Sequence, residues 1–600
     1  MFKEAFIFSL ALVSSIFAYL RKAQFHVDAD EGVTGLMATH IFEGSSLPVF
    51  YYGQNYIGPM EALLAAFLFN FIEDRVVALK LAATIFSVLA YLLGYITLAK
   101  YFCKTSAIIF SIIFCFPGQF MLEWFSMARG NFSYTLFAAF VTTLFVARMN
   151  EKMSIFLGLF HGFSWWQNGQ LTSIALAYTT LFFKNKAITH YLAGFIIGML
   201  PVIWFNLIND FGTLEQLGKK NYDIPLNVEN FFTLFLPTLL GFVRTYHQSG
   251  FAMFLAGAIF FATFFSLFRK NTDDAQKRII HFNVLNQIMF FTIFVISSFG
   301  SSKIEPRYGM ALLPSVAILT SIVVANIRTT LIVVFIFLLI VPRTKSFFIE
   351  AQFKPSGTKL IGHKARIPRD LQGLVSALKN KEIYSVRTPY WLAYNLAYVS
   401  QETVRVHLVR EPFVSRYVYF KHADLRDIPV LDHENFKDYY KRIAQITGSD
   451  FFEDEVTATI KLYRVVPSVS NFNYNFRLKG DWNEVDLAKL TDGDLMTYWH
   501  TNKTFSSGIL FFAEINGCFK GISVCTSRYF QDIPEKLELN INEKKIPIPD
   551  EWVNYLKSSG CLDFLLPQNF YNTSLKLYGY TGIDKKFFPS FSEFRVISCE

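Results

Sequence analysis

Four ionisable side chains lie within six positions of one short segment: His26, Asp28, Asp30 and Glu31. The segment follows directly after the first apolar run, residues 5–20, so we expect it at or just outside a membrane face. Ionisable groups are costly near hydrocarbon, where they usually serve a transport pathway or a reaction. The simpler alternative is a solvated loop in which aspartates cap a helix predicted for residues 32–42.

Three further polar stretches follow later apolar runs: residues 123–131 with Glu123 and Arg129, residues 244–247, and residues 303–308 with Lys303, Arg307 and Tyr308. The topology that the basic loops predict places all four stretches on one side of the membrane. A carboxylate there can accept the proton of a hydroxyl nucleophile. An arginine can stabilise the charge that develops on a phosphate leaving group. The alternative for each arginine is an anchor that reaches to the lipid headgroups.

The composition indicates a membrane protein. Of the 600 residues, 52% are hydrophobic and 68 are phenylalanine, which is too apolar for a soluble chain. Up to residue 342 the chain is a series of apolar runs, and from Arg343 onward it is typical of a soluble protein. The net charge of +9 lies largely in short loops between apolar runs, and no basic helix is present. The sequence therefore gives no sign of a nucleic-acid partner.

The basic loops also predict a topology. Lys3 places the N-terminus in the cytoplasm and residues 26–31 outside. The first apolar run lacks a small-residue cleavage site before Arg21, so we expect a retained helix. Alternation of the later runs, which include residues 106–122 and 191–207, gives about eleven spans if residues 60–72 lie in the interface and residues 231–243 are re-entrant or interfacial. It gives thirteen if both of these segments cross. Either count leaves the region after residue 342 on the outer side, in the periplasm for a bacterial inner membrane.

The region after the membrane runs divides into two predicted domains. Residues 343–467 mix an amphipathic helix with short alternating runs, which indicates a small α/β unit. Residues 468–600 show short alternating runs between turns, typical of a β-sandwich. Four of the six cysteines lie in this last domain and permit two disulfides, whose pairing stays open: Cys518, Cys525, Cys561 and Cys599. The other two lie among the membrane runs, where we expect inert packing residues.

Several short motifs occur in a fixed order along the first 342 residues: Asp30-Glu31, residues 37–41, Glu43-Gly44, residues 48–50, residues 58–61, residues 127–132, Leu200-Pro201 with Asn206-Leu207, and Pro306-Arg307-Tyr308 with residues 312–314. This set resembles the protein O-mannosyltransferase-like glycosyltransferases (family 39-like) of the GT-C superfamily, which also includes the lipid A aminoarabinose transferases. The resemblance covers most of residues 1–342. It implies a GT-C fold and an inverting enzyme that takes a sugar from a polyprenyl-phosphate carrier.

The same resemblance assigns roles to residues. Asp30 matches the catalytic acidic residue, with Glu31 beside it, and Asp30 is predicted to be the general base. Arg307, Tyr308, Arg129 and Lys303 are predicted to bind the donor phosphate. Asp28 and Glu123 are candidates for a second acidic residue, although Glu123 matches no motif of the family. Some members of the superfamily bind a divalent metal; Asp28 and Asp30 could hold one here, but no ligand set is evident.

A second resemblance lies near the C-terminus. Leu490 to Asp494 and Thr497 to Thr501 resemble the signature of discoidin-like, galactose-binding-like β-sandwiches. It implies a carbohydrate site with Asp492, Asp494 and Trp499. The alternative is an ordinary turn followed by a core tryptophan.

These observations predict a membrane glycosyltransferase that acts on an extracytoplasmic glycan, lipid or protein acceptor. The alternative is a non-enzymatic transporter of lipid-linked glycans, or a carbohydrate-binding membrane protein. A transporter would favour inverted repeats and helices broken at mid-membrane, which are not evident in the sequence. A bacterial inner membrane is favoured over the endoplasmic reticulum, although glycosylation sequons at Asn502 and Asn572 leave the latter open.

Overall fold

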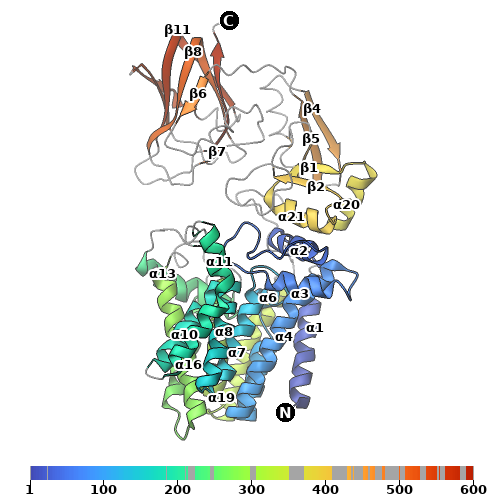
Figure 1. The fold of residues 1–600 in the computed structure, drawn as a ribbon, viewed down its shortest axis with the longest axis vertical. Coiled ribbons are helices and arrows are strands. Elements are labelled where there is room, and N and C mark those ends of the chain that lie inside the picture. The colour runs from blue at the N-terminus through green and yellow to red at the C-terminus, as the bar shows by residue number, and fades with distance from the viewer. Residues whose placement is uncertain are drawn as a thin grey trace. The chain divides into compact units, whose positions relative to one another are not determined.

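The computed structural model divides the chain into two compact units, residues 1–355 and 356–600 (Figure 1). It describes residues 2–22, 25–183, 186–209, 211, 213, 223–243, 249–297, 306–349, 370–408, 429–433, 437, 450–456, 460–466, 476–479, 499–500, 507–526, 536–542, 544–550, 553, 561–580 and 590–598. Each unit is described by itself.

The first unit is a bundle of α-helices. Its helices are α1 Phe2–Lys22, α2 Ala29–Phe42, α3 Met60–Leu68, α4 Arg75–Tyr101, α5 Lys104–Cys115, α6 Gln119–Ser126, α7 Phe132–Val146, α8 Glu151–Gln167, α9 Thr172–Phe182, α10 Ala187–Gly198, α11 Leu200–Ile208, α13 Ile224–Asn230, α14 Leu236–Leu239, α15 Gly250–Ala262, α16 Asp274–Val295, α18 Leu313–Val324 and α19 Thr329–Ile349. Short 3-10 or π turns are η1 Gly169–Leu171, η2 Phe231–Phe235, η3 Thr263–Phe268 and η4 Pro306–Gly309.

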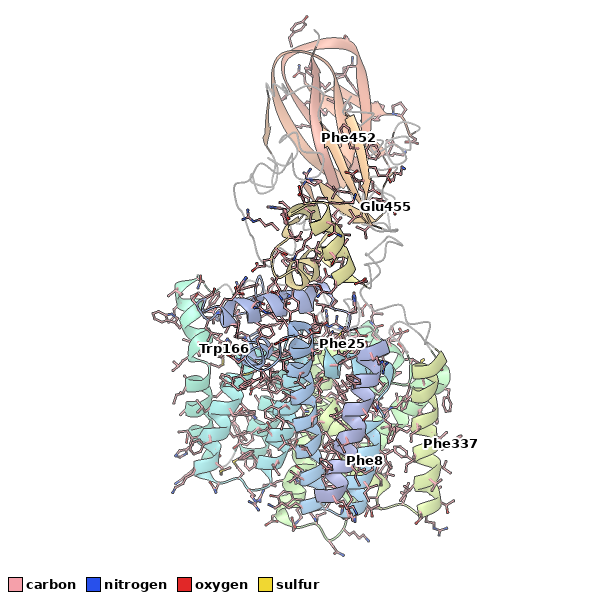
Figure 2. The ribbon with its side chains drawn as sticks, turned by 90° about the vertical axis from the view of Figure 1, so that its right-hand side faces the viewer. Phe8, Phe25, Trp166, Phe337, Phe452 and Glu455 are labelled. Carbon is pink, nitrogen blue, oxygen red and sulfur yellow. The ribbon has the colours of Figure 1, made fainter. Side chains whose placement is uncertain are left out.

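The protein is a multi-pass membrane protein. Four single helices among the described residues are long and apolar enough to cross a bilayer, and six spans result if each of two bent helix pairs counts as one. Three shorter apolar helices accompany them: Phe132–Val146, Leu313–Val324 and Thr329–Ile340. Large apolar side chains such as Phe337 on α19 are exposed, as expected of a surface that faces lipid (Figure 2). The count of eleven to thirteen spans stays a prediction.

Two runs that we expected to be single spans are bent. Residues 106–122 form α5 and α6, which meet at 89°, and residues 191–207 lie in α10 and α11, which meet at 52°. The first break falls at Pro117-Gly118 and the second is followed by Pro201. Proline lacks the backbone N–H that would continue the helical hydrogen bonding, so a long apolar run breaks there.

Glycines allow α8 and α10 to pack closely. A Cβ atom on Gly158 would collide with the backbone carbonyl of Tyr191, and one on Gly194 would collide with the carbonyl of Ile155. Gly162 and Gly198 make equally close backbone approaches. Small residues four apart let helix backbones come together in a membrane, where van der Waals packing stabilises helix pairs.

One end of the bundle carries the short helices. The N-terminus lies at the opposite end, and α1 leads from there to α2, with α3 and α6 close by (Figure 1). The helix predicted for residues 32–42 is α2, which begins three residues earlier at Ala29. The segment expected to lie in the interface, residues 60–72, contains α3, a helix of only nine residues.

The second unit contains two sheets. The first has the order β2-β1-β3-β5-β4, in which β1 runs parallel to β2 and β3. Its elements are α20 Leu371–Asn380, β1 Ser385–Thr388, α21 Tyr390–Val399, β2 Arg405–Leu408, β3 Val430–His433, β4 Asp450–Glu455 and β5 Ile460–Val466. Helix α21 connects two parallel strands, which is the arrangement of a βαβ unit. This is the α/β unit expected from the sequence.

The second sheet has the order β10-β9-β11-β8-β12-β7, with β6 paired to β8. Its strands are β6 Phe476–Lys479, β7 Trp499–His500, β8 Ser507–Thr526, β9 Lys536–Ile541, β10 Lys544–Ile548, β11 Cys561–Tyr580 and β12 Ser590–Ser598. The register places Cys525 opposite Cys561, two of the cysteines whose pairing the sequence leaves open. Asp492 and Asp494 lie outside the described residues, and Trp499 begins β7, so the carbohydrate site stays a prediction.

Candidate active site

The acidic segment forms the start of α2. Asp28 is the N-cap residue, and its carboxylate accepts a hydrogen bond from the backbone N–H of Glu31 at 2.8 Å. The capping role considered for this segment therefore holds for Asp28. Asp30 and Glu31 lie in the first turn, where carboxylates interact favourably with the helix dipole.

Glu31 is fully buried and links three segments. Its Oε2 atom lies 2.5 Å from Lys80 Nζ on α4, and its Oε1 atom accepts the backbone N–H of Ala128 at 3.2 Å. Lys80 is also buried and donates to the backbone carbonyl of His26 at 2.7 Å. Burial raises the pKa of Glu31, and the bonds from Lys80 and Ala128 act in the opposite direction. Both oxygens of Glu31 thus hold neighbouring structure in place.

Arg129 connects two carboxylates from distant parts of the chain. Its guanidinium group forms ion pairs with Asp28 and with Glu123, the latter at 2.7 Å. All three side chains are buried or nearly so. The guanidinium carbon also lies 3.9 Å from the ring centre of Trp124, so the aromatic face restricts the orientation of the planar guanidinium group.

Arg307 and Tyr308 lie next to this cluster on η4. The Arg307 guanidinium is 5.5 Å from the ring centre of Trp124 and 5.8 Å from that of Phe132. The rings of Tyr308 and Phe132 contact each other edge-on at 6.0 Å between centroids. Trp124 therefore has two guanidinium groups near its ring, Arg129 and Arg307.

Asp30 differs from its two acidic neighbours in exposure. Asp28 and Glu31 are completely buried, whereas Asp30 is only half-buried. Its backbone carbonyl accepts a hydrogen bond from the Tyr51 hydroxyl at 2.5 Å, which fastens the following loop to α2. That loop is also held by Trp166 on α8, whose indole N–H donates to the carbonyl of Val49 at 2.7 Å. Of these three acidic residues, Asp30 is therefore the one that is partly exposed.

A second buried carboxylate, Glu61 at the start of α3, was not assigned a role from the sequence. It accepts hydrogen bonds from Ser133 Oγ at 2.6 Å and from the backbone N–H of Asn131 at 3.1 Å. The backbone N–H of Glu61 in turn donates to Asn131 Oδ1 at 2.9 Å. Burial raises the pKa of Glu61 to about 7. The available signal was a carboxylate within the motif of residues 58–61.

Asn131 lies two residues after Arg129 and connects the loop that carries Arg129 to Glu61. Its φ of 58° is in the left-handed region, which asparagine tolerates better than most residues. Its side-chain amide donates to the carbonyls of Gly58 and Gln167 at 2.5 and 3.1 Å. The loop that carries Arg129 is thus fixed against the segment that precedes α3.

The structure brings together most of the predicted site residues. Asp28, Glu123, Arg129 and Arg307 form one cluster around Trp124, and Glu31 joins it through Ala128. Lys303 and residues 244–247 lie outside the described residues. Within the described part of the chain, no group of three or more His, Cys, Asp or Glu side chains is arranged to hold a metal ion.

Comparison with known proteins identifies the fold. No family model matches the sequence, and no curated protein matches it. Among solved structures, the chain is similar to ArnT from Cupriavidus metallidurans. The apo structure gives a TM-score of 0.52 at 10% identity, over 76% of this chain and 97% of ArnT. The form bound to undecaprenyl phosphate gives 0.52 at 11% identity, with the same coverage.

A second match is the archaeal oligosaccharyltransferase AglB from Archaeoglobus fulgidus, solved with an inhibitory peptide and a dolichol-phosphate. The alignment covers 98% of each chain at 11% identity. Its TM-score of 0.41 is too low to establish a common fold. The likeness to ArnT confirms the GT-C membrane fold expected from the sequence.

Proposed function

We propose that this protein is a membrane glycosyltransferase that transfers a sugar from a polyprenyl-phosphate carrier to an acceptor hydroxyl. The observation that carries the proposal is one cluster. The acidic first turn of α2 lies against Arg129, and Arg129 shares the Trp124 ring with Arg307. This cluster belongs to a bundle with the fold of ArnT, which has been solved with undecaprenyl phosphate bound.

Asp30 is the general base in this proposal. It is the accessible carboxylate of the first turn, while Asp28 and Glu31 are committed to Arg129 and Lys80. Asp30 takes the proton of the acceptor hydroxyl as its oxygen bonds to the anomeric carbon. The bond from that carbon to the phosphate oxygen breaks on the opposite face. The configuration inverts, and the carrier phosphate leaves with the electron pair.

Arg307 and Tyr308 receive the carrier phosphate. A guanidinium group offers paired donors that match phosphate oxygens, and its charge stabilises the leaving group. The ring of Trp124 restricts the orientation of Arg307, which lowers the cost of ordering that side chain when the donor binds. Arg129, which is paired with Asp28 and Glu123, lies beside Arg307 at the Trp124 ring, and Lys303 is also predicted to bind the donor phosphate.

The roles of the other acidic residues follow from their contacts. Glu31, predicted to be catalytic from its place beside Asp30, instead positions the first turn of α2 through Lys80 and Ala128. Asp28 caps that turn, and Glu123 is the second carboxylate that forms an ion pair with Arg129. The acceptor is an extracytoplasmic glycan, lipid or protein, and the membrane is a bacterial inner membrane.

Replacement of Asp30 by Asn tests the proposal. Asn keeps nearly the shape of Asp but does not serve as a proton acceptor, and the N-cap residue Asp28 is untouched, so transfer from a polyprenyl-phosphate sugar should fall about 100- to 10,000-fold with folding retained. Glu43→Gln at the other end of α2 is the matched control. Glu43 is exposed and pairs only weakly with Arg75 at 3.4 Å, so transfer should stay near the wild-type rate. A folded Asp30→Asn protein with wild-type transfer would contradict the assignment.

A further inference from the structure

We propose that the Arg129 side chain is the resident cation of the acidic centre and takes the place of a divalent metal between Asp28 and Glu123. The part of this inference that concerns catalysis rests on the proposed function. The part that concerns cation binding by the two carboxylates can be tested without any transfer assay.

The carboxylate oxygens of Asp28 and Glu123 already accept hydrogen bonds from protein groups. On Asp28, Oδ1 accepts the N–H of Glu31 and Oδ2 accepts Nη1 of Arg129. On Glu123, Oε1 accepts Nη2 of Arg129 at 2.7 Å. Mg²⁺, Mn²⁺ and Ca²⁺ require several oxygen ligands at about 2.0–2.6 Å, arranged around one point. The guanidinium group lies where the oxygens of Asp28 and Glu123 would otherwise converge.

Glu31 is the other buried carboxylate at the start of α2. Its Oε2 atom is held by Lys80 and its Oε1 atom by the Ala128 N–H. A metal ion that recruited Glu31 would break a buried ion pair and leave the Lys80 ammonium without its counterion, which is unfavourable away from water. A divalent ion would also be repelled by the buried charges of Arg129 and Lys80.

The surrounding residues also fix the Arg129 side chain in place. Trp124 stacks on its guanidinium at 3.9 Å, and the side chain is nine-tenths buried. The backbone just beyond Arg129 is fixed because Asn131 is hydrogen-bonded to Glu61, Gly58 and Gln167. The guanidinium therefore supplies a permanent positive charge that orients the cap of α2, and with it Asp30, as a bound metal ion would.

Cation binding tests the inference on the purified full-length protein in detergent, with Mn²⁺ as the probe and electron paramagnetic resonance as the readout. Wild-type protein should bind no Mn²⁺ through Asp28. Arg129→Ala leaves two facing carboxylates without a cation and should acquire about one Mn²⁺ site per protein. The double variant Arg129→Ala, Asp28→Asn should lose that site, and Arg129→Lys, which keeps the charge, should not gain it.

Transfer assays provide the second arm. Wild-type activity should change less than about twofold in excess EDTA, since no metal contributes to the charge at this centre. Arg129→Ala should transfer about a hundredfold more slowly, with part of that loss restored by Mn²⁺. A residue that only stabilised the fold would show no such rescue.

The outcomes separate this inference from the proposed function. Mn²⁺ bound by wild-type protein and lost in Asp28→Asn overturns the inference even if every Arg129 variant fails to fold. Loss of wild-type transfer in EDTA with recovery in Mn²⁺ also overturns it. A folded Arg129→Ala protein that binds no Mn²⁺ counts equally against it. Absence of any glycosyl transfer by wild-type protein refutes the proposed function and leaves the Mn²⁺-binding results to decide the inference.

Discussion

The three carboxylates at the start of α2 are neighbours in sequence with different surroundings. Asp28 and Glu31 are buried, and each is paired with a cation from another segment, Arg129 and Lys80 respectively. Asp30 lies between them with its side chain partly exposed. Successive residues in the first turn of a helix point in different directions, so one segment can hold both buried, paired carboxylates and a partly exposed one. Their chemical equivalence in the sequence does not extend to their roles.

The buried pair of Glu31 and Lys80 should be important for stability. Glu31→Gln leaves the Lys80 ammonium buried beside a neutral group, and breaking such a pair by removing one partner costs about 3–5 kcal/mol. We expect a clearly lower midpoint of thermal unfolding in detergent, measured by intrinsic fluorescence. The double variant Glu31→Gln, Lys80→Met should recover part of the loss because no unpaired charge remains. Equal midpoints for wild-type and Glu31→Gln would contradict this expectation.

Glu61 should make stability depend on pH. Its pKa is raised to about 7 from an ordinary value of 4.5, so between these pH values the folded protein holds a proton that the unfolded chain has lost. This contribution to stability is fully present below pH 4.5 and is lost as the pH rises through 7, for a total of about 3 kcal/mol. Glu61→Gln should therefore reduce the decline in unfolding midpoint between pH 5 and pH 8. Ser133→Ala keeps the carboxylate and removes a hydrogen bond that lowers its pKa, so that variant should retain or steepen the decline. An unchanged decline in Glu61→Gln would refute the assignment.

At the scale of elements, close packing of α8 and α10 depends on glycine. These helices precede and follow α9, and α8 ends at Gln167, next to the loops of the site. A side chain on the facing positions would separate the backbones, because its Cβ atom would meet a main-chain carbonyl that cannot move alone. The contact therefore has little tolerance for larger residues.

Gly158→Ala should destabilise the bundle. The added Cβ atom would collide with the carbonyl of Tyr191, and such overpacking costs about 1–3 kcal/mol. Gly257→Ala in α15 is the matched control, since a Cβ atom there meets nothing within 4 Å. The control should be neutral or slightly stabilising because alanine favours helix. Thermal unfolding of the two variants in the same detergent measures the difference, and equal midpoints would show that α8 and α10 tolerate separation.

At the scale of the whole molecule, the site and the N-terminus lie at opposite ends of the bundle (Figure 1). The basic loops predict a cytoplasmic N-terminus, which would place Asp30 outside. The second unit, residues 356–600, is predicted on the same outer side, where it could contact an extracytoplasmic acceptor.

Topology reporters test this placement. A reporter active only outside the cytoplasm, fused after Ser356, should be active, and the same reporter fused after Lys100 should be inactive. Protease added to the outer face should remove the second unit while the helical bundle stays protected. A cytoplasmic reporter signal after Ser356 would overturn the predicted topology and with it the location of the acceptor.

The sequence by itself determined the class of protein and much of its local structure. Apolar runs of membrane length, the change in composition near Arg343 and alternating runs after residue 343 predicted a helical membrane region followed by α/β and β structure. These properties are local, because burial in lipid and strand alternation each leave a pattern within a few consecutive residues. The prolines at the two bends, Pro117 and Pro201, were also visible in the sequence, but the apolar runs around them favoured single spans.

The tertiary structure decided how far each acidic residue is exposed and which partner each of the buried ones contacts. Asp28 pairs with Arg129, Glu31 with Lys80, and Glu61 with Asn131, across separations of 101, 49 and 70 positions. A carboxylate has the same local pattern whether it is paired or accessible. Its burial and its partner depend on how α2, α3, α4 and the loop before α7 pack together, and that packing comes from contacts between distant segments.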